Sequence, residues 1–252
     1  MADHLFIVTG ASRGLGAAMT AALLRPGHHL LCIARNNPAD AVDEAARRGA
    51  RMEQWNVDLG APEPVAERLH GWLGAFDGHA LAGATLVNNA AMLTRIGPFD
   101  DCPATEIAQS LRVSLEAPLL LTAAFLRATR NWAALRRVLN VSSGLGRRAM
   151  AGTASYCAAK AGMDHFSRAL ALDEASRPNG ARIVSLAPGV IDTDMQVQLR
   201  SAEPTGFPDR PVFVGLKAGG QLSTAADAAA KILAYLERPD FGAQPVADVR
   251  DA

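Results

Sequence analysis

The sequence has few cysteines, no excess of either charge and no long uninterrupted apolar run. Its 3 cysteines lack CxxC spacing and its 6 histidines lack ligand spacing, so we expect no metal and a reducing compartment, the cytosol. The 25 basic and 25 acidic residues balance, which argues against a nucleic-acid partner. The apolar stretch 115–126 contains Glu116 and is too short to span a membrane, and we expect no signal peptide in residues 1–10.

The chain does contain short apolar runs that alternate with amphipathic stretches. This alternation is typical of βαβ units, and it predicts an α/β fold with a parallel sheet covered by helices on both faces. No linker divides the chain, so we expect one domain over residues 1–252. The expected strands cover residues 4–10, 29–35, 50–59, 84–91, 136–143 and 181–189. The expected helices cover residues 15–24, 41–48, 62–76, 104–132, 153–177 and 224–236.

Prolines and glycines interrupt residues 195–222. They are expected to break any helix there, which predicts a long irregular surface segment. Because long irregular segments in compact domains often cover a binding site, we expect this segment to act as a lid over the substrate.

A glycine-rich loop, "TGASRGLG", covers Thr9–Gly16, between the first expected strand and the first expected helix. Glycine permits a tight turn and lets a pyrophosphate approach the backbone, while the free N–H groups of the helix N-terminus face the phosphate. The loop therefore predicts a dinucleotide-binding site. Its expected cofactor-binding residues are Gly10, Ser12, Arg13, Gly14, Leu15 and Gly16.

The end of the second expected strand indicates which dinucleotide binds. An acidic residue there would bind a ribose 2′-hydroxyl, whereas arginine would bind a 2′-phosphate. Arg35 occupies this position, and Arg13 lies in the glycine loop, so two guanidinium groups could pair with one phosphate. We therefore predict NADP(H) as the cofactor. Asp40 lies close enough in sequence to leave NAD(H) as the alternative.

Five motifs occur in an order that resembles the short-chain dehydrogenase/reductases. They are "TGASRGLG", "NNAA" at Asn88–Ala91, "VSS" at Val141–Ser143, "YCAAK" at Tyr156–Lys160 and "APGVIDTDM" at Ala187–Met195. Together with "ARNN" and "VDLG", they are most similar to the sepiapterin reductases and the bacterial benzil reductases. The resemblance implies a single Rossmann-type domain with strand order 3-2-1-4-5-6-7. It also implies a homodimer or a homotetramer.

The resemblance assigns roles to single residues. Ser143, Tyr156 and Lys160 match the catalytic residues of the family. Asp58 and Leu59 would meet the adenine edge, and Asn88 and Ala90 would close over the adenosine ribose. Pro188, Gly189, Val190 and Thr193 would hold the nicotinamide end, where Tyr156 and Lys160 also bind.

Tyr156 and Lys160 are four residues apart and so share one helix face. Carbonyl reduction needs a hydride at carbon and a proton at oxygen. A free tyrosine has a pKa of about 10. A nearby ammonium favours the phenolate, and the oxidised nicotinamide adds positive charge, so we expect the pKa of Tyr156 to fall toward the working pH. Tyr156 is then the general acid, Lys160 its activator, and Ser143 the hydrogen-bond donor to the substrate oxygen.

Two further residues carry predictions by resemblance. Ser114, eight residues before Thr122, stands where the family often has an asparagine that holds a water of the proton relay. A serine could bind such a water, or the enzyme could be slower. Asp248 aligns with the aspartate that holds the substrate's amino group in sepiapterin reductases, although it could equally be an ordinary acidic residue near a solvated terminus.

These observations predict an NADPH-dependent enzyme that reduces a small ketone or vicinal diketone to an alcohol. One alternative is an NAD-dependent alcohol dehydrogenase of the same family. Another is a dinucleotide-binding sensor or scaffold that has lost efficient chemistry, which the serine at position 114 keeps open.

Overall fold

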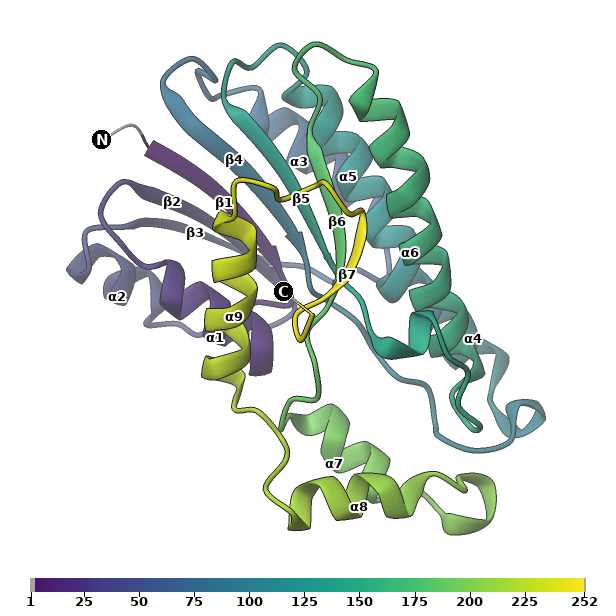
Figure 1. Ribbon diagram of the computed structural model, residues 1–252. Coiled ribbons are helices and arrows are strands. Elements are labelled where there is room, and N and C mark those ends of the chain that lie inside the picture. Colours follow the sequence, from purple (N-terminus) through teal and green to yellow (C-terminus); the bar gives the residue numbers. More distant parts are fainter. Residues whose placement is uncertain (1–2, 252) are drawn as a thin grey trace.

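A computed structural model describes residues 3–251 of the chain. A parallel seven-stranded sheet forms its centre, with the order β3-β2-β1-β4-β5-β6-β7 (Figure 1). The α/β class and this strand order were both predicted and are confirmed. The strands are β1 Asp3–Thr9, β2 His28–Ala34, β3 Arg51–Asn56, β4 Leu81–Asn88, β5 Leu135–Val141, β6 Arg182–Ala187 and β7 Val246–Asp248.

Helices cover both faces of the sheet and bury one apolar layer on each side. On one face, α1 and α9 contribute Met19 and Ile232 to the core. On the other face, α3 and α5 contribute Leu69 and Phe125. The strands are apolar on both sides because helices cover both faces, which explains their continuous hydrophobic runs. The helices on these faces are α1 Gly14–Leu23, α2 Ala41–Arg47, α3 Pro62–Leu73, α4 Ala104–Leu111, α5 Ala117–Ala128, α6 Ala154–Ala175 and α9 Ala225–Glu237.

The long helix expected over residues 104–132 is interrupted. Between α4 and α5 lies one π-helical turn, η2, at Arg112–Glu116. Pro118, in the first turn of α5, has no N–H to donate to the carbonyl of Ser114, and its ring would collide with that carbonyl in a regular helix. The wider π turn relieves this conflict, and such turns are frequent at functional sites. Ser114 itself is fully buried in η2.

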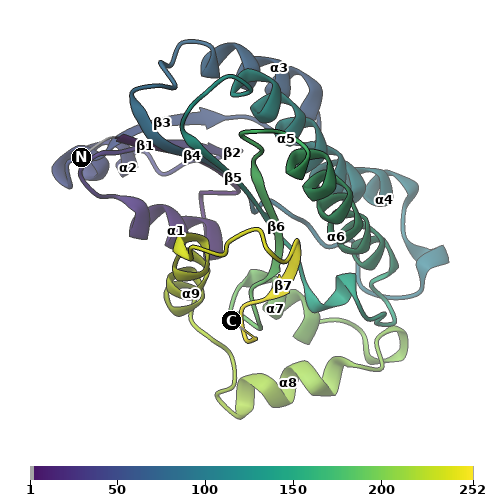
Figure 2. The ribbon, with the colours of Figure 1, turned by 45° about the horizontal axis from the view of Figure 1, so that its top comes forward.

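Residues 195–222 are not irregular, so that part of the prediction was wrong. They include most of α7 at Asp194–Arg200, a short turn η4 at Pro204–Gly206, and α8 at Arg210–Ala218. Pro204 and Pro211 occupy first-turn positions of η4 and α8, where a missing N–H costs no helical bond, and Pro208 lies in the turn between the two. Pro204 and Pro211 therefore lie at the starts of these helices and do not break them. Both α7 and α8 lie outside the two layers of helices that cover the faces of the sheet (Figure 2).

Within residues 3–251, no helix is long and apolar enough to cross a membrane.

Candidate active site

Most of the predicted site residues lie in separate segments that the sheet brings to one end. The strands are parallel, so the segments that follow β1 to β6 all leave the sheet at its carboxyl end. The chain also reverses its direction of progress across the sheet between β1 and β4. A crevice forms at such a switch point, and ligands of open α/β sheets bind there.

The glycine loop has a backbone that only glycine adopts without strain. Gly10 and Gly14 have φ values of +66° and +54°. A Cβ on Gly10 would lie 2.9 Å from the side-chain nitrogen of Asn89, and a Cβ on Gly16 would overlap the carbonyl oxygen of Gly10. Glycine at these positions therefore lets the loop close against the end of β4.

The loop ends at a helix N-terminus that suits a phosphate. Arg13 precedes α1 in an extended conformation and makes no capping hydrogen bond with its side chain, and the first turn of α1 has no acidic residue. Its N–H groups and the positive end of its dipole are suited to an anion. The residues present thus fit a dinucleotide pyrophosphate. Leu15 is buried in the core, so only its backbone could contribute, whereas Ser12 is half-buried.

Asn89 is a residue that the sequence analysis missed. Its side-chain nitrogen donates to the carbonyl oxygens of Thr9, at 3.0 Å, and Gly10, at 3.3 Å. The hydroxyl of Thr9 accepts hydrogen bonds from the backbone N–H groups of Asn89 and Ala90, both at 3.0 Å. These bonds join the ends of β1 and β4 beneath the glycine loop. The paired asparagines of "NNAA" were the available signal.

Asn88, predicted to meet the cofactor, instead lies in the core with its side chain almost fully buried. Its side-chain nitrogen donates to the Thr122 hydroxyl at 3.0 Å and to the Asn140 side-chain oxygen at 2.8 Å. These contacts connect β4 with α5 and β5, so the side chain orders the strand end from below. Its cofactor role stays a prediction.

The two arginines proposed for a 2′-phosphate are in different surroundings. Arg35 is exposed at the end of β2 and makes no ion pair with any of residues 3–251. Arg13 donates from Nη1 to Asp194 at the start of α7, at 2.6 Å, and both side chains are about 70% exposed, at 69% and 73%. Asp58 is exposed and accepts a hydrogen bond from the backbone of Gly60 at 2.9 Å.

Leu59, the neighbour of Asp58, is buried in the core, so its side chain packs beneath the surface.

On the other side of the crevice, residues 188–193 carry the predicted nicotinamide contacts. Gly189 turns the chain with a φ of +81°, and Val190 accepts a hydrogen bond from the backbone of Ser223 at 3.0 Å. Thr193 precedes α7 and lies 3.5 Å from where a Cβ of Gly14 would be. The segment that starts at Pro188 therefore reaches the glycine loop.

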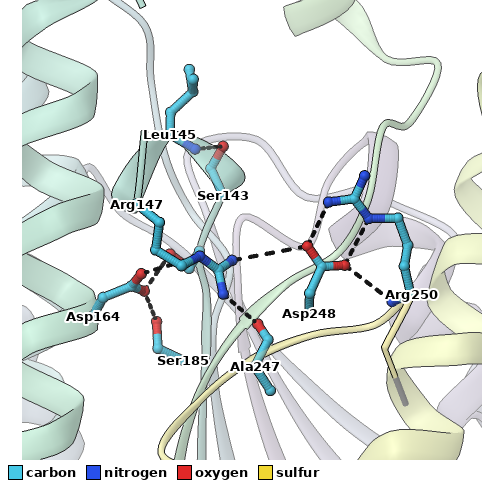
Figure 3. Close-up of polar contacts among 9 residues, drawn as sticks. Ser143, Leu145, Arg147, Asp164, Ser185, Ala247, Asp248 and Arg250 are labelled. Carbon is cyan, nitrogen blue, oxygen red and sulfur yellow. Dashed lines mark hydrogen bonds and ion pairs between the residues drawn. The ribbon is translucent and has the colours of Figure 1, made fainter. Parts of the chain in front are cut away.

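Tyr156 and Lys160 lie on α6 as the spacing predicted, and both are buried. Lys160 donates from Nζ to the carbonyl oxygen of Val141 at 2.7 Å, and this Nζ lies 5.5 Å from the centre of the Tyr156 ring. Ser143 follows β5 and precedes the short turn η3 at Gly144–Gly146. Its hydroxyl oxygen accepts a hydrogen bond from the backbone of Leu145 at 3.1 Å (Figure 3).

Burial dominates the proton affinities of this pair. It raises the pKa of Tyr156 to about 12, and the Ser143 hydroxyl, which favours the phenolate, only partly opposes this rise. Burial also lowers the pKa of Lys160 to about 8, against the attraction of the nearby Asp164. The prediction of a lowered pKa for Tyr156 is therefore wrong for the chain by itself, because desolvation of the phenolate outweighs its stabilisation. At neutral pH the phenol keeps its proton.

Ser114 contacts the segment after β4. Its hydroxyl accepts a hydrogen bond from the backbone N–H of Met92 at 3.1 Å and donates to the Met92 carbonyl at 3.4 Å. Ser110, one turn earlier, donates to the same carbonyl at 3.1 Å. The second lone pair of the Ser114 hydroxyl is still available to accept a hydrogen bond from water. Its role in a proton relay stays a prediction.

An apolar cluster surrounds the ring of Tyr156. It is separate from the two layers that cover the sheet, and it combines side chains from the segment after β4 with side chains from α7 and the residue after η4. Its buried members are Leu93, Ile96, Tyr156, Leu199 and Phe207. The segment predicted to act as a lid therefore packs against the candidate general acid.

Asp248, predicted to bind the substrate, lies on β7 in an ion pair. Arg250 donates to its two carboxylate oxygens at 2.8 and 2.6 Å, and Arg147 approaches to 4.0 Å (Figure 3). The hydrogen bonds from Arg250 hold the pKa of Asp248 below its usual value. A substrate amino group would have to compete with these guanidinium groups. The substrate role of Asp248 stays a prediction.

Comparisons with known proteins agree with this geometry. A model of the short chain dehydrogenase family matches residues 4–204. The chain is 30% identical over 235 residues to benzil reductase ((S)-benzoin forming) of Bacillus subtilis, covering 93% of this chain and 94% of that one. It is 32% identical over 254 residues to sepiapterin reductase of Bos taurus, covering 94% of this chain and 91% of that one.

A solved structure with a similar fold is the 3-oxoacyl-[acyl-carrier protein] reductase of Brucella melitensis in complex with NAD. It superimposes with a TM-score of 0.79 at 25% identity, covering 98% of this chain and 95% of that one. The motif order, the strand order and the family match lead to one conclusion. The chain belongs to the short-chain dehydrogenase/reductase family of oxidoreductases.

Proposed function

We propose that the protein reduces a small, mainly apolar ketone or vicinal diketone to an alcohol, with NADPH as the hydride donor. The observation that carries this proposal is the position of the Tyr156 phenol, which lies in an apolar cluster near Ser143 and Lys160. The similarity to the benzil reductases of Bacillus subtilis and Bacillus cereus supports a carbonyl substrate.

NADPH, when bound, supplies the hydride. In the proposed reaction Tyr156 donates its proton to the carbonyl oxygen, and Ser143 donates a hydrogen bond to that oxygen as negative charge develops on it. A pKa of about 12 keeps the phenol protonated at neutral pH, as a proton donor must be. Alcohol oxidation, the reverse reaction, would use the same tyrosine as its general base. The choice of reduction therefore rests on the similarity to the benzil and sepiapterin reductases.

The surroundings of Tyr156 favour an uncharged substrate. The cluster around its ring contains leucine, isoleucine and phenylalanine side chains, and partly buried methionines pack against it. A charged group placed there would lose its hydration without gaining a partner. An aromatic or aliphatic ketone would instead gain apolar contact.

The decisive test compares the two tyrosines of the chain. Tyr156→Phe removes only the hydroxyl and is expected to lower kcat by about 10²- to 10⁴-fold, the range for general acid catalysis, with an unchanged Kd for NADPH. Tyr235→Phe, in the core on α9, is the matched control and should keep kcat. NADPH oxidation would be followed with diketones, quinones and pterins.

Retained activity in Tyr156→Phe would contradict the proposed mechanism. Tight NADPH binding by the wild type without oxidation of any substrate in the panel would favour the sensor alternative.

We also propose NADP(H) rather than NAD(H). Arg35 is exposed, and no carboxylate within residues 3–251 pairs with it, so its guanidinium is available for a 2′-phosphate. Arg35→Ala should raise the Kd for NADPH and leave the Kd for NADH unchanged. Arg130→Ala, an exposed arginine after α5, controls for a general loss of charge. Equal weakening of both cofactors in Arg35→Ala would contradict the assignment.

We further propose that residues 1–252 form one domain and that α7 and α8 form a lid over the substrate.

We also propose that the protein is a homodimer or a homotetramer. An apolar groove of about 400 Å³ on α4, η2 and α5 supports self-association. Sedimentation velocity of the wild type would measure the oligomeric state, and a monomer would contradict it.

A further inference from the structure

A buried carboxylate that the proposed reaction does not use lies on the helix that carries the catalytic pair. Asp164 of α6 is 1% exposed and lies one turn after Lys160 and two turns after Tyr156. Its Oδ1 accepts hydrogen bonds from the hydroxyls of Ser142 and Ser185, both at 2.6 Å. A buried carboxylate is costly unless its oxygens are satisfied, so these short bonds hold all three residues in place.

The second oxygen of Asp164 faces a guanidinium. Oδ2 is buried without a hydrogen-bond partner, and Nε of Arg147 lies 3.9 Å from it (Figure 3). Arg147 also donates to the carbonyl oxygen of Ala247 at 3.2 Å and lies 4.0 Å from Asp248. Arg147 therefore lies between two carboxylates, one on α6 and one on β7.

The partners of Asp164 flank Ser143 on both sides. Ser142 precedes it, and Arg147 follows it after the single turn η3. Gly146 in that turn lets the chain approach, because a Cβ there would lie 2.8 Å from Oδ2 of Asp164. One carboxylate thus contacts the segment that carries Ser143 at both of its ends.

We propose that Asp164 is a positioning residue that fixes Ser143 relative to Tyr156. The role rests on the proposed function, since it matters only if both hydroxyls act on one carbonyl oxygen. Asp164 acts through Ser142 and Arg147 and does not itself touch the substrate. The segment 142–147 is connected in this way to the helix that holds the proton donor, and through Arg147 to the C-terminal strand.

The experiment replaces Asp164 with its uncharged isostere. In Asp164→Asn, one oxygen can still accept from the serines, but an amide replaces the charge that faces Arg147. Amide hydrogen exchange of residues 142–150 should become faster, and kcat should fall by about 10- to 100-fold, the loss expected when reacting groups are misplaced by about 1 Å. The Kd for NADPH should stay unchanged, because the polar partners of Asp164 are Ser142, Ser185 and Arg147, and none of them is a predicted cofactor-binding residue. Asp173→Asn, an exposed acid on α6, is the matched control for both measurements.

Two milder variants keep the test decisive if Asp164→Asn folds poorly. Ser142→Ala removes the contact next to Ser143, and Ser185→Ala removes the equivalent bond from β6. We expect faster exchange and a lower kcat in Ser142→Ala, with a smaller effect in Ser185→Ala. Equal effects of the two serine variants would show general support of the fold and would overturn the proposal.

The exchange measurement separates this proposal from the proposed function. A wild type that reduces no carbonyl compound contradicts the function, and exchange in residues 142–150 then decides the positioning role alone. Folded Asp164→Asn with wild-type exchange overturns the positioning role, whatever its activity. Faster exchange with an unchanged kcat also overturns it, because Ser143 would then need no such support.

Discussion

The cofactor side and the substrate side of the candidate site lie at the same edge of one sheet, but different contacts build them. The cofactor side consists of backbone: glycines with positive φ, a helix N-terminus without a side-chain cap, and a strand end held by Asn89. The substrate side consists of side chains from distant segments, such as Tyr156, Phe207 and Asp164. The comparison teaches that a local motif can define the first kind of site, whereas the second depends on packing.

The largest effect is expected for a side chain added to the glycine loop. Gly16→Ala would place a Cβ on the carbonyl oxygen of Gly10, so the loop must open and the Kd for NADPH should rise by about 100-fold or more. Gly71→Ala is the control, since nothing lies within 4 Å of a Cβ at this exposed position of α3, where alanine should stabilise the helix slightly. Calorimetric titration measures the Kd. An unchanged Kd would mean that the backbone does not define the cofactor side.

Phe207→Ala tests the substrate side. Phe207 is fully buried against the cluster that contains Tyr156, so its removal should lower the free energy of unfolding by about 3–5 kcal/mol and raise KM for the ketone. The Kd for NADPH should not change. Val212→Ala, at a side chain of α8 that is 58% exposed, should change neither value. Urea unfolding and steady-state kinetics measure both, and weaker NADPH binding in Phe207→Ala would contradict the separation of the two sides.

A pH-dependent effect of intermediate size is expected from Lys160. Burial lowers its pKa from 10.5 to about 8, so between these values the unfolded chain binds more protons than the folded one. The folded state therefore gains stability as pH rises through this window, by at most about 1.4 kcal/mol per pH unit. Lys160→Met should lose this gain, whereas Lys231→Met, exposed on α9, should keep it.

Urea unfolding of wild type and variants at about pH 7 and about pH 9.5 measures the difference, and the upper value stays below the pKa of an unfolded tyrosine, about 10. If the free energy of unfolding changed equally with pH in the wild type and in Lys160→Met, the pKa of Lys160 would not be lowered in the folded state, which would contradict the prediction.

The smallest effect is expected where the two sides meet. The Arg13–Asp194 pair joins the glycine loop to α7, but both side chains are mostly exposed. Such pairs contribute little to stability, so Asp194→Asn should leave Tm unchanged. It frees Arg13, which should lower the Kd for NADPH by at most about fivefold and leave that for NADH unchanged. An equal change for both cofactors would show that Arg13 does not contact a 2′-phosphate.

Several features of the fold could be predicted because their causes are local. Alternating apolar runs gave six of the strands, and the spacing of Tyr156 and Lys160 placed both on one face of α6. The seventh strand, Val246–Asp248, is too short for a periodic pattern. The helices α7 and α8 were missed because the prolines of residues 195–222 were interpreted as breakers, although Pro204 follows α7 and begins η4, and Pro211 stands in the first turn of α8. Pro118 could have indicated the π turn before α5.

The candidate site was less predictable where burial decides its properties. The lysine one turn from Tyr156 suggested a lowered pKa, yet the phenol is buried and its pKa rises to about 12. Asp164 gave no signal, because nothing in its sequence neighbourhood shows that it meets Ser142 and Ser185.

The sequence by itself determined the alternation of strands and helices along the chain, the glycine loop and the shared helix face of Tyr156 and Lys160, because backbone conformation and helical spacing are set by neighbouring residues. The order of the strands in the sheet was expected only from the family resemblance. Only the tertiary structure decided which groups are desolvated and which distant residues meet. Arg13 and Asp194 are 181 positions apart, and Asp164 contacts Ser142 just after β5 and Ser185 within β6. Contacts of this kind depend on the packed arrangement of the whole sheet and its helices, and so does the electrostatic balance around the phenol.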